Sequence, residues 1–348
     1  MKGEAYMNAQ RAGLGLTFVI TAVTVLVALV LGTSTGGATS LRTQANALIG
    51  DSIPQGSDPS LKIQAKALRA DAAKYGLSVI QADANLDLNK QIADVDTFIQ
   101  KKVKFITIWP MDSRGIQPVL ARARKAGIRV ITQQTPNGVN RDVNLQADDV
   151  NSGVRAAKYL AGRLGRGGKV AAVFGPQQVD SFRDLAQGFL KGARDSGLVV
   201  VDKQVNQNLT PEASSTFVRN WKQRYGSQLG GIFDSLDATA FAAIPVRDAS
   251  FKPLIVTYGG SDEALEAVRR GDFAALAYQY TVVAGRASAW VADRLNHGVK
   301  LPANIYVPQP LVAKSNVGQF RPSATQIRSK IRFGLTRGAG RTTLVVNR

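Results

Sequence analysis

Short apolar runs alternate along the chain with longer stretches in which apolar residues recur every three or four positions. Four runs in the first half have the length and composition of buried strands: residues 47–53, 77–83, 105–109 and 128–134. The stretches between them have the spacing of one helix face, and glycines such as Gly76 and Gly127 stand where those helices would end. The pattern predicts a series of strand–helix units.

The same alternation continues in the second half. Predicted strands lie at 170–175, 199–205, 231–235, 254–258 and 273–279. Thr210 with Pro211, and later Ser261, are residue types that begin helices. Because strands that alternate with helices form parallel sheets covered on both faces, we predict an α/β protein. Four units precede residue 147 and others follow it, so two doubly wound lobes are favoured over one wide sheet.

One apolar run near the N-terminus is different. Residues 12–41 contain no charge and residues 14–31 are nearly all apolar, with Lys2 and Arg11 before them. This is typical of a Sec signal peptide, and small residues predict cleavage after Ala38. The alternative is an uncleaved anchor, because a span needs roughly 20 apolar residues. Both readings place the rest of the chain in the periplasm or elsewhere outside the cytoplasm, with membrane contact only if the leader is retained.

Composition narrows the chemistry. The chain has 348 residues, no cysteine and one histidine, so thiolate chemistry and a multi-histidine zinc site are excluded. The glycine-rich stretch before Lys169 precedes a predicted strand, and valine follows the lysine, so it is not a phosphate-binding P-loop. The sequence has no dinucleotide-binding motif after the first strand. It also has no paired acids at successive strand ends, as a hydrolase or metal site would need. We therefore expect no enzymatic activity, no catalytic residue, no cofactor and no metal.

The chain is strongly basic, with a formal net charge of +19. Seven Arg or Lys and no acid follow Phe320, and we expect residues 321–348 to form a flexible basic tail. Nucleic-acid binding is the alternative for so basic a chain. No recognition motif accompanies the charge, so we expect no nucleic-acid partner and favour a basic surface near an anionic membrane.

Ligands of open α/β sheets bind beyond the carboxyl ends of the strands. The residues at these predicted ends are Asp58, Ser60, Trp109, Gln134, Thr135, Arg183, Leu236, Tyr258 and Gln279. Aromatic rings can stack on sugar faces, while Arg and Gln can hydrogen-bond to hydroxyls. A core position for Trp109, a solvated position for Arg183 and a simple turn after Tyr258 are the structural alternatives.

From about Ala47 to Phe320 the chain resembles type I periplasmic sugar-binding proteins of the ribose-binding kind. The stretches that carry the resemblance are Asn89–Ile92, Ala126–Ile131, Ala147–Gly153, Ser181–Asp184, Gly260–Leu265, Arg270–Gly271, Tyr278–Gln279 and Ile305–Pro308. The resemblance implies a substrate-binding protein of an ABC importer. Such a protein captures a small polar solute, here a sugar or sugar-like molecule, by hinge closure and presents it to the transporter permease. The alternative is a membrane-anchored sensing module that presents the bound state to a receptor kinase. We expect a monomer.

The resemblance also implies three crossings between the lobes, near residues 147–148, 279–280 and 307–311. The leader then occupies 1–38. The N-terminal lobe comprises 39–147 plus 280–307, and the C-terminal lobe comprises 148–279 plus 308–320.

Carried over by position, the ligand contacts of the family fall on Asp58, Ser60, Trp109, Gln134, Arg183, Leu236, Tyr258, Gly259 and Gln279. Gln134–Thr135 stands where an Asp–Arg pair is usual, and Gly259 stands where an Asp is usual. Leu236 replaces a frequent Asn, and Trp109 a small polar residue. With two carboxylates missing, the pocket is expected to be flatter and less anionic than a ribose pocket.

Overall fold

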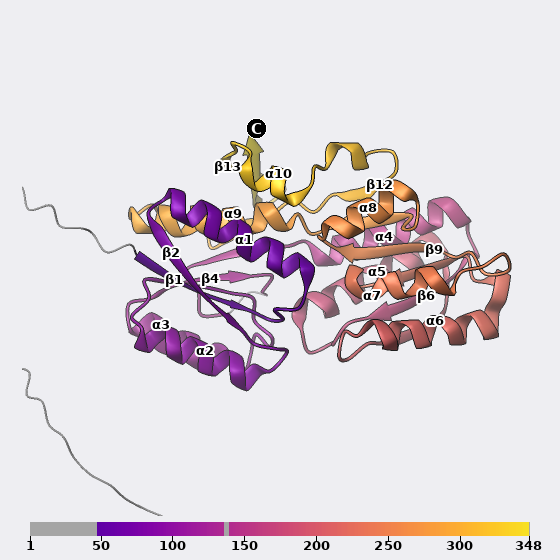
Figure 1. Cartoon of the computed structure of the whole chain (residues 1–348), viewed down its shortest axis with the longest axis horizontal. Helices are drawn as coiled ribbons and strands as arrows, with labels where there is room; N and C mark the ends of the chain where they lie inside the picture. The colour runs from indigo at the N-terminus through magenta and orange to yellow at the C-terminus, as the bar shows by residue number, and fades with distance from the viewer. Residues whose placement is uncertain (1–46, 136–138, 348) are drawn as a thin grey trace, which may run out of the picture. The chain divides into compact units, whose positions relative to one another are not determined.

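The computed structural model describes residues 47–135 and 139–347. The leader therefore lies outside the described residues, and no helix within them is long and apolar enough to cross a membrane. The strands form two sheets, each covered by helices (Figure 1). The prediction of a type I periplasmic-binding-protein fold, with two doubly wound α/β lobes joined by three chain crossings, is confirmed.

The N-terminal lobe is built on an eight-stranded sheet. Its order is β13 (Arg332–Gly338), β14 (Arg341–Asn347), β11 (Asn304–Tyr306), β5 (Val143–Gln146), β4 (Arg129–Gln133), β3 (Phe105–Ile108), β1 (Ala47–Ile53) and β2 (Leu77–Asp83). The helices of this lobe are α1 (Pro59–Lys74), α2 (Leu88–Gln100), α3 (Gln117–Lys125), α9 (Thr281–Asn296) and α10 (Ser323–Arg328). Every strand pair is parallel except β13 with β14.

The C-terminal lobe is built on a six-stranded sheet. Its order is β12 (Leu311–Ala313), β10 (Ala275–Tyr278), β9 (Leu254–Gly259), β8 (Gly231–Asp234), β6 (Lys169–Phe174) and β7 (Val199–Val205). Its helices are α4 (Asp149–Leu164), α5 (Asp180–Ser196), α6 (Pro211–Tyr225), α7 (Asp237–Ala240) and α8 (Asp262–Arg270), with short 3-10 turns at Gly226–Gln228, Phe241–Val246 and Val317–Gln319. Only β12 runs antiparallel to its neighbour.

Local sequence signals explain several helix starts. The Asp58 carboxylate accepts hydrogen bonds from the backbone N–H groups of Ser60 and Leu61, and Pro59 follows it at the first helical position of α1. The predicted starts at Thr210 and Ser261 are confirmed, since both hydroxyls cap the helices that follow. These caps place the first turns of α1 and α8 at the strand ends, where the candidate site residues lie.

The chain crosses between the sheets three times. It leaves β5 for α4 at Ala147–Asp148, leaves β10 for α9 at Gln279–Tyr280, and leaves β11 for β12 through Val307–Pro310. Each lobe is therefore assembled from separate stretches of sequence. The strand ends of both sheets face these crossings, which sets the place of the site.

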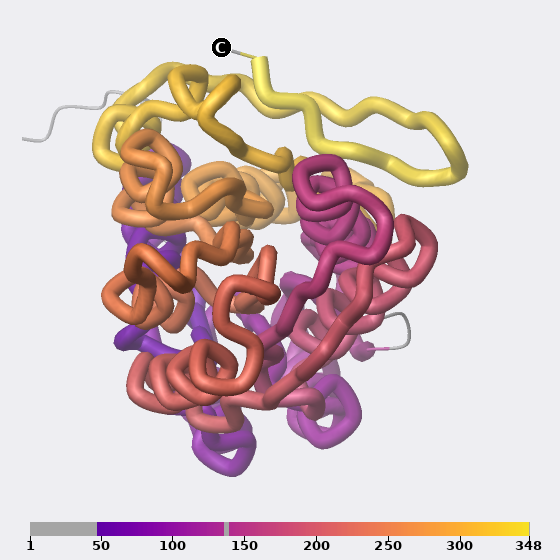
Figure 2. Tube along the Cα trace, turned by 90° about the vertical axis from the view of Figure 1, so that its right-hand side faces the viewer, coloured from indigo at the N-terminus to yellow at the C-terminus, as the bar shows by residue number. Residues whose placement is uncertain are grey.

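The expectation of a flexible tail after Phe320 is wrong for the described residues 321–347. They form α10 and a hairpin, and β14 joins the eight-stranded sheet beside β11, pairing Thr343 with Tyr306 (Figures 1 and 2). Leu344 is 1% exposed, and the ring of Phe333 packs 5.8 Å from that of Trp290. The hydrophobic alternation around Gly338–Gly340 is a hairpin signal that the charge count obscured.

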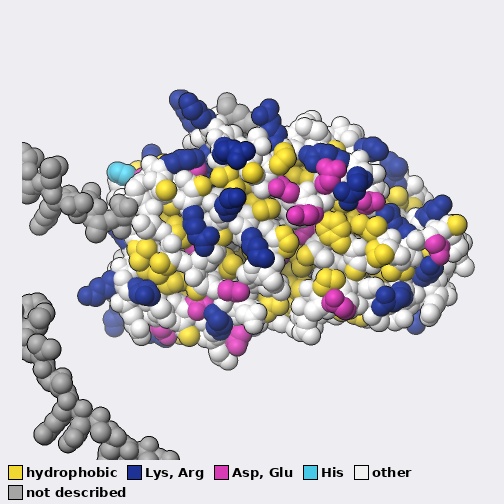
Figure 3. Space-filling view, in the orientation of Figure 1, with side chains coloured by type: hydrophobic (Ala, Val, Ile, Leu, Met, Phe, Trp, Pro, Cys, Tyr) yellow, Lys and Arg dark blue, Asp and Glu magenta, His cyan; other side chains and the backbone are white. Residues whose placement is uncertain are grey.

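On one face of the molecule the charged side chains are dispersed. On the face shown in Figure 3, Lys and Arg side chains are scattered among acidic and apolar ones rather than gathered in a stripe. A stripe or patch of basic residues is the electrostatic footprint of nucleic-acid binding. This face does not have that arrangement.

Candidate ligand-binding site

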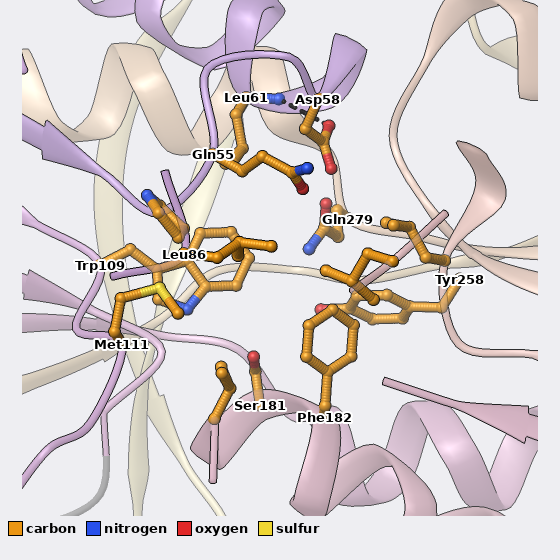
Figure 4. A pocket seen from close by; sticks show the side chains of 14 residues that line it. Gln55, Asp58, Leu61, Leu86, Trp109, Met111, Ser181, Phe182, Tyr258 and Gln279 are labelled. Atoms are coloured by element: carbon orange, nitrogen blue, oxygen red, sulfur yellow. Dashed lines mark hydrogen bonds between the residues drawn. The ribbon is translucent and has the colours of Figure 1, made fainter. Parts of the chain in front are cut away.

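A cavity lies between the lobes, at the carboxyl ends of the strands (Figure 4). It is lined by Pro54, Gln55, Asp58, Leu61, Leu86, Trp109 and Met111 of the N-terminal lobe, and by Val179, Ser181, Phe182, Leu209, Leu236, Tyr258 and Gln279. The space inside it that water-sized molecules can reach is about 40 Å³, enough for a few water molecules. A solute of sugar size would therefore need the lobes or the lining side chains to move apart.

Five of the nine predicted site residues line this cavity: Asp58, Trp109, Leu236, Tyr258 and Gln279. Figure 4 shows Trp109 and Tyr258 on opposite sides, with Gln279 between them. The Trp109 backbone is held by Gln91, a buried residue of α2 that the sequence reasoning missed. Its amide donates to the Trp109 carbonyl at 2.9 Å and accepts from the Met111 N–H at 2.8 Å. The tryptophan is thereby positioned rather than left at a loose loop end.

Two fully buried polar atoms of the described lining side chains have no hydrogen-bond partner. These are Trp109 Nε1 and Ser181 Oγ, which are both buried. Figure 4 shows the Ser181 hydroxyl directed from the start of α5 into the space between Trp109 and Phe182. A buried polar group without a partner costs about 1–3 kcal/mol. Both atoms therefore favour a ligand with polar groups of its own.

Asp58 contributes a carboxylate to the same space. One of its oxygens, Oδ1, caps α1, and Figure 4 shows the other turned toward Gln279. Burial raises the pKa of this carboxyl, and hydrogen bonds from the Leu61 and Ser60 N–H groups oppose the rise. Asp58 thus has one structural oxygen and one that can accept a hydrogen bond from a ligand.

Tyr258 connects the cavity to two of the crossings. Its hydroxyl donates to Asp149 Oδ1 at 2.6 Å, and Gln309 Nε2 donates to the Tyr258 hydroxyl at 3.0 Å. Burial raises the pKa of Asp149 to about 7, although Tyr258 and Gln309 donate to it. Asp149 follows the first crossing and Gln309 lies in the third, so neither could be assigned to the site from strand ends alone.

Four predicted site residues do not line the cavity. Ser60 Oγ accepts the Gly260 N–H at 3.0 Å, a bond between the two lobes. Gln134 has a φ of 51°, and its Oε1 lies 3.4 Å from the Tyr258 hydroxyl, which donates its proton to Asp149. Arg183 is paired with Asp180 on its own helix, and 37% of its side chain is exposed. Its role as a ligand contact stays a prediction.

Gly259, the fourth, lies directly against Asp237. A Cβ atom on Gly259 would stand 2.2 Å from Asp237 Cγ, so the Asp237 carboxylate fills the space that a side chain at 259 would need. Asp237 is fully buried, and burial and the neighbouring Asp58 raise its pKa to about 6. Sequence reasoning missed this residue. The absence of an acid at position 259 therefore does not leave the region without a carboxylate.

A metal centre finds no support in the described ranges 47–135 and 139–347, where no cluster of three His, Cys, Asp or Glu is arranged to hold an ion. The polar side-chain groups that line the cavity are amides, hydroxyls, an indole and one carboxylate. This set suits recognition of hydroxyl-rich molecules.

Comparison with known proteins agrees with this architecture. The family model for the periplasmic binding protein domain matches residues 49–299. The ribose import binding protein of Bacillus subtilis is 29% identical over 265 residues, covering 76% of this chain and 86% of that protein. The xylitol-binding protein of Mycolicibacterium smegmatis is 25% identical over 271 residues, 76% of each chain.

Solved structures show the same fold. A periplasmic solute-binding protein from Actinobacillus succinogenes, solved with D-allose, superposes with a TM-score of 0.74 at 23% identity, covering 79% of this chain and all of that one. A solute-binding protein from Mycobacterium smegmatis, solved with glycerol, gives a TM-score of 0.70 at 26% identity, covering 79% and 96%. From its fold, its cleft and the match over most of its length, this chain belongs to the periplasmic binding protein domain family.

Proposed function

We propose that this protein is the extracytoplasmic substrate-binding protein of an ABC importer and that its ligand is a small polyhydroxylated solute, a sugar or a polyol. The observation that carries the proposal is the cavity between the lobes. There, the rings of Trp109 and Tyr258 flank buried hydrogen-bonding atoms that have no protein partner. Aromatic faces with converging polar groups are the usual means of holding such solutes. The relatives named above bear names or bound molecules of this class.

Ligand capture would work through lobe closure. In this structure α1 and α9 of the N-terminal lobe both hold Gly260 of the C-terminal lobe: Ser60 Oγ accepts its N–H, and the Thr281 hydroxyl donates to its carbonyl at 3.1 Å. Opening at the crossings would break the first of these bonds and admit the solute. A ligand stabilises the closed form only by its greater affinity for that form. The closed form is then the one that the permease would recognise.

Export by Sec remains part of the proposal, because the leader lies outside the described residues. N-terminal sequencing of the secreted protein tests it. A start near Thr39 is expected for a freely diffusing binding protein. Retention of residues 14–31 would instead indicate an anchored one.

Calorimetric titration of the exported protein with D-ribose, D-allose, xylitol, myo-inositol and glycerol tests the function. We expect micromolar or tighter binding of at least one compound, with a change in intrinsic fluorescence and no chemical turnover. Absence of binding across this panel and its wider sugar and polyol series would contradict the proposal.

A further inference from the structure

The contact between Asp237 and Gly259 has a consequence for ligand recognition. We propose that Asp237 is a specificity-determining residue whose free carboxylate oxygen accepts a hydrogen bond from a hydroxyl or ammonium group of the ligand. The inference rests on the proposed function, because it concerns the same cavity. Asp237, at the start of α7, would then supply the acidic contact to the ligand that Gly259 cannot make.

Steric complementarity is the first observation. A Cβ on Gly259 would lie 2.2 Å from Asp237 Cγ and 2.5 Å from both carboxylate oxygens. Position 259 therefore accepts only glycine while Asp237 keeps its place. The Asp237 side chain reaches this point from the neighbouring strand end because β8 and β9 are paired, with Asp234 opposite Thr257.

Hydrogen bonding is the second observation. Asp237 Oδ2 accepts from the Ser261 N–H at 3.0 Å and from the Ser261 hydroxyl at 2.7 Å. Asp237 Oδ1 is buried and has no hydrogen-bond partner. An unpartnered carboxylate oxygen costs more than a neutral group in the same position, and a donor brought by the ligand would remove that cost.

Position is the third observation. Asp237 is fully buried and does not itself line the cavity in this form, but Leu236, the residue before it, does line it, and so does Asp58, whose charge contributes to the raised pKa of Asp237. No Lys or Arg is among the described residues that line the cavity. Two carboxylates without a cation favour ligands with donor groups, neutral or positively charged, and disfavour phosphorylated or carboxylated sugars.

A purely structural role is the alternative, in which Asp237 only holds the turn at Ser261. The two roles separate in a pair of variants. Asp237→Asn keeps the size of the side chain but removes the carboxylate charge. Ser261→Ala removes one of the two hydrogen bonds to Oδ2 and leaves the carboxylate intact.

Binding constants are measured by calorimetry for the exported protein and both variants. The probes are two pairs: D-ribose with 2-deoxy-D-ribose, and D-glucose with D-glucosamine. We expect Asp237→Asn to weaken binding of the tightest-binding probe at least tenfold. The ratio of the two binding constants within its pair should also become smaller. Ser261→Ala should weaken binding less than threefold. If Asp237→Asn lowers the affinity for D-ribose more than that for 2-deoxy-D-ribose, the donor is a hydroxyl. If it lowers the affinity for D-glucosamine more than that for D-glucose, the donor is an ammonium group.

Unchanged affinity in a folded Asp237→Asn protein, or equal losses in both variants, would overturn the inference. If Asp237→Asn does not fold, Gly259→Ala provides the second test, since its Cβ displaces the carboxylate and should also lower affinity at least tenfold. Wild-type affinity in that variant would overturn the inference as well. Failure of the wild-type protein to bind any sugar or polyol would count against the proposed function instead.

Discussion

Two regions of the molecule, the contact between α1 and α9 and the strand ends of the C-terminal lobe, place buried carboxylates in contrasting settings. In the N-terminal lobe, Asp71 is paired with Arg286 at 2.7 Å, and both side chains are only 3% exposed. In the C-terminal lobe, Asp149, Asp234 and Asp237 are buried with neutral hydrogen-bond donors, and burial raises their pKa values to about 7, 7 and 6. The contrast separates a buried ion pair from buried acids whose hydrogen-bond donors are all neutral.

The Asp71–Arg286 pair also explains why the C-terminal extension is ordered. Arg286 donates to the backbone carbonyls of Gln326 and Ser329 at 2.9 and 3.0 Å, which ties α10 to α9. Ile327 completes this contact by packing with Ala67 and Val282. A buried ion pair thus joins a segment beyond the family domain to the N-terminal lobe.

The largest effect is expected from breaking this pair. Arg286→Gln removes the buried cation of Asp71 and leaves it only Lys74, whose side chain is 52% exposed. Removing one partner of a buried pair costs about 3–5 kcal/mol. Urea unfolding should show this loss, with faster proteolysis after residue 320. Arg122→Gln is the matched control, because Arg122 pairs with Asp96 at the surface and should cost less than about 1 kcal/mol. Equal losses of stability in both variants would show that the buried pair contributes no more than the surface pair.

The buried acids of the C-terminal lobe should make the stability of the protein depend on pH. Asp234 has an ordinary pKa of 3.8 and about 7 in the fold. Between these values the folded protein holds a proton that the unfolded chain releases, so stability falls as the pH rises through this window. Asp234→Asn removes this contribution, and its Tm should fall less than that of the wild type between about pH 5 and pH 8.

Asp248→Asn is the control for this experiment. Asp248 is exposed, and the hydrogen bond from Lys222 lowers its pKa, so its contribution is lost only in more acidic solution. Its Tm profile should parallel the wild type above pH 5. If the Tm profile of Asp234→Asn also parallels that of the wild type, burial of this carboxylate does not set the slope of Tm against pH.

The two walls of the cavity can be compared by removing one hydrogen-bonding group from each. Trp109→Phe keeps an aromatic ring but lacks Nε1, and Ser181→Ala lacks Oγ. Each should weaken binding of the calorimetric ligand by about 1 kcal/mol, roughly fivefold, because a partner of the ligand is lost. A loss in only one variant would place the ligand against one lobe, and no loss in either would mean that neither atom meets it.

The smallest effect is expected at Arg183. Its guanidinium is paired with Asp180, and the residue is absent from the lining of the cavity. Arg183→Ala should therefore change affinity less than threefold, and Arg219→Ala, on the exposed side of α6, serves as the surface control. A tenfold loss at Arg183 alone would return this residue to the site and show that it moves on ligand binding.

Local patterns predicted the local structure well. The Ser261 cap and the Thr210–Pro211 start are confirmed because a cap is decided by neighbours a few residues away. The short strands β5, β11 and β12 were not predicted, since β5 and β11 mix polar with apolar residues and β12 has only three residues. None of them shows the longer apolar run that marked the equally short β3. The hairpin β13–β14 was not predicted, because the strongly basic composition of residues 321–348 favours a flexible tail despite the alternation of Leu344 and Val346.

The sequence by itself determined the two-lobed α/β architecture and the positions where strands end, which is why Trp109, Tyr258 and Gln279 could be named in advance. Only the tertiary structure decided that Asp237 fills the space at Gly259 and that Asp149 and Gln309 meet at Tyr258. The physical reason is the range of the interactions. Helix and strand patterns are local, whereas these contacts depend on strand register and on chain crossings that join residues up to 160 positions apart.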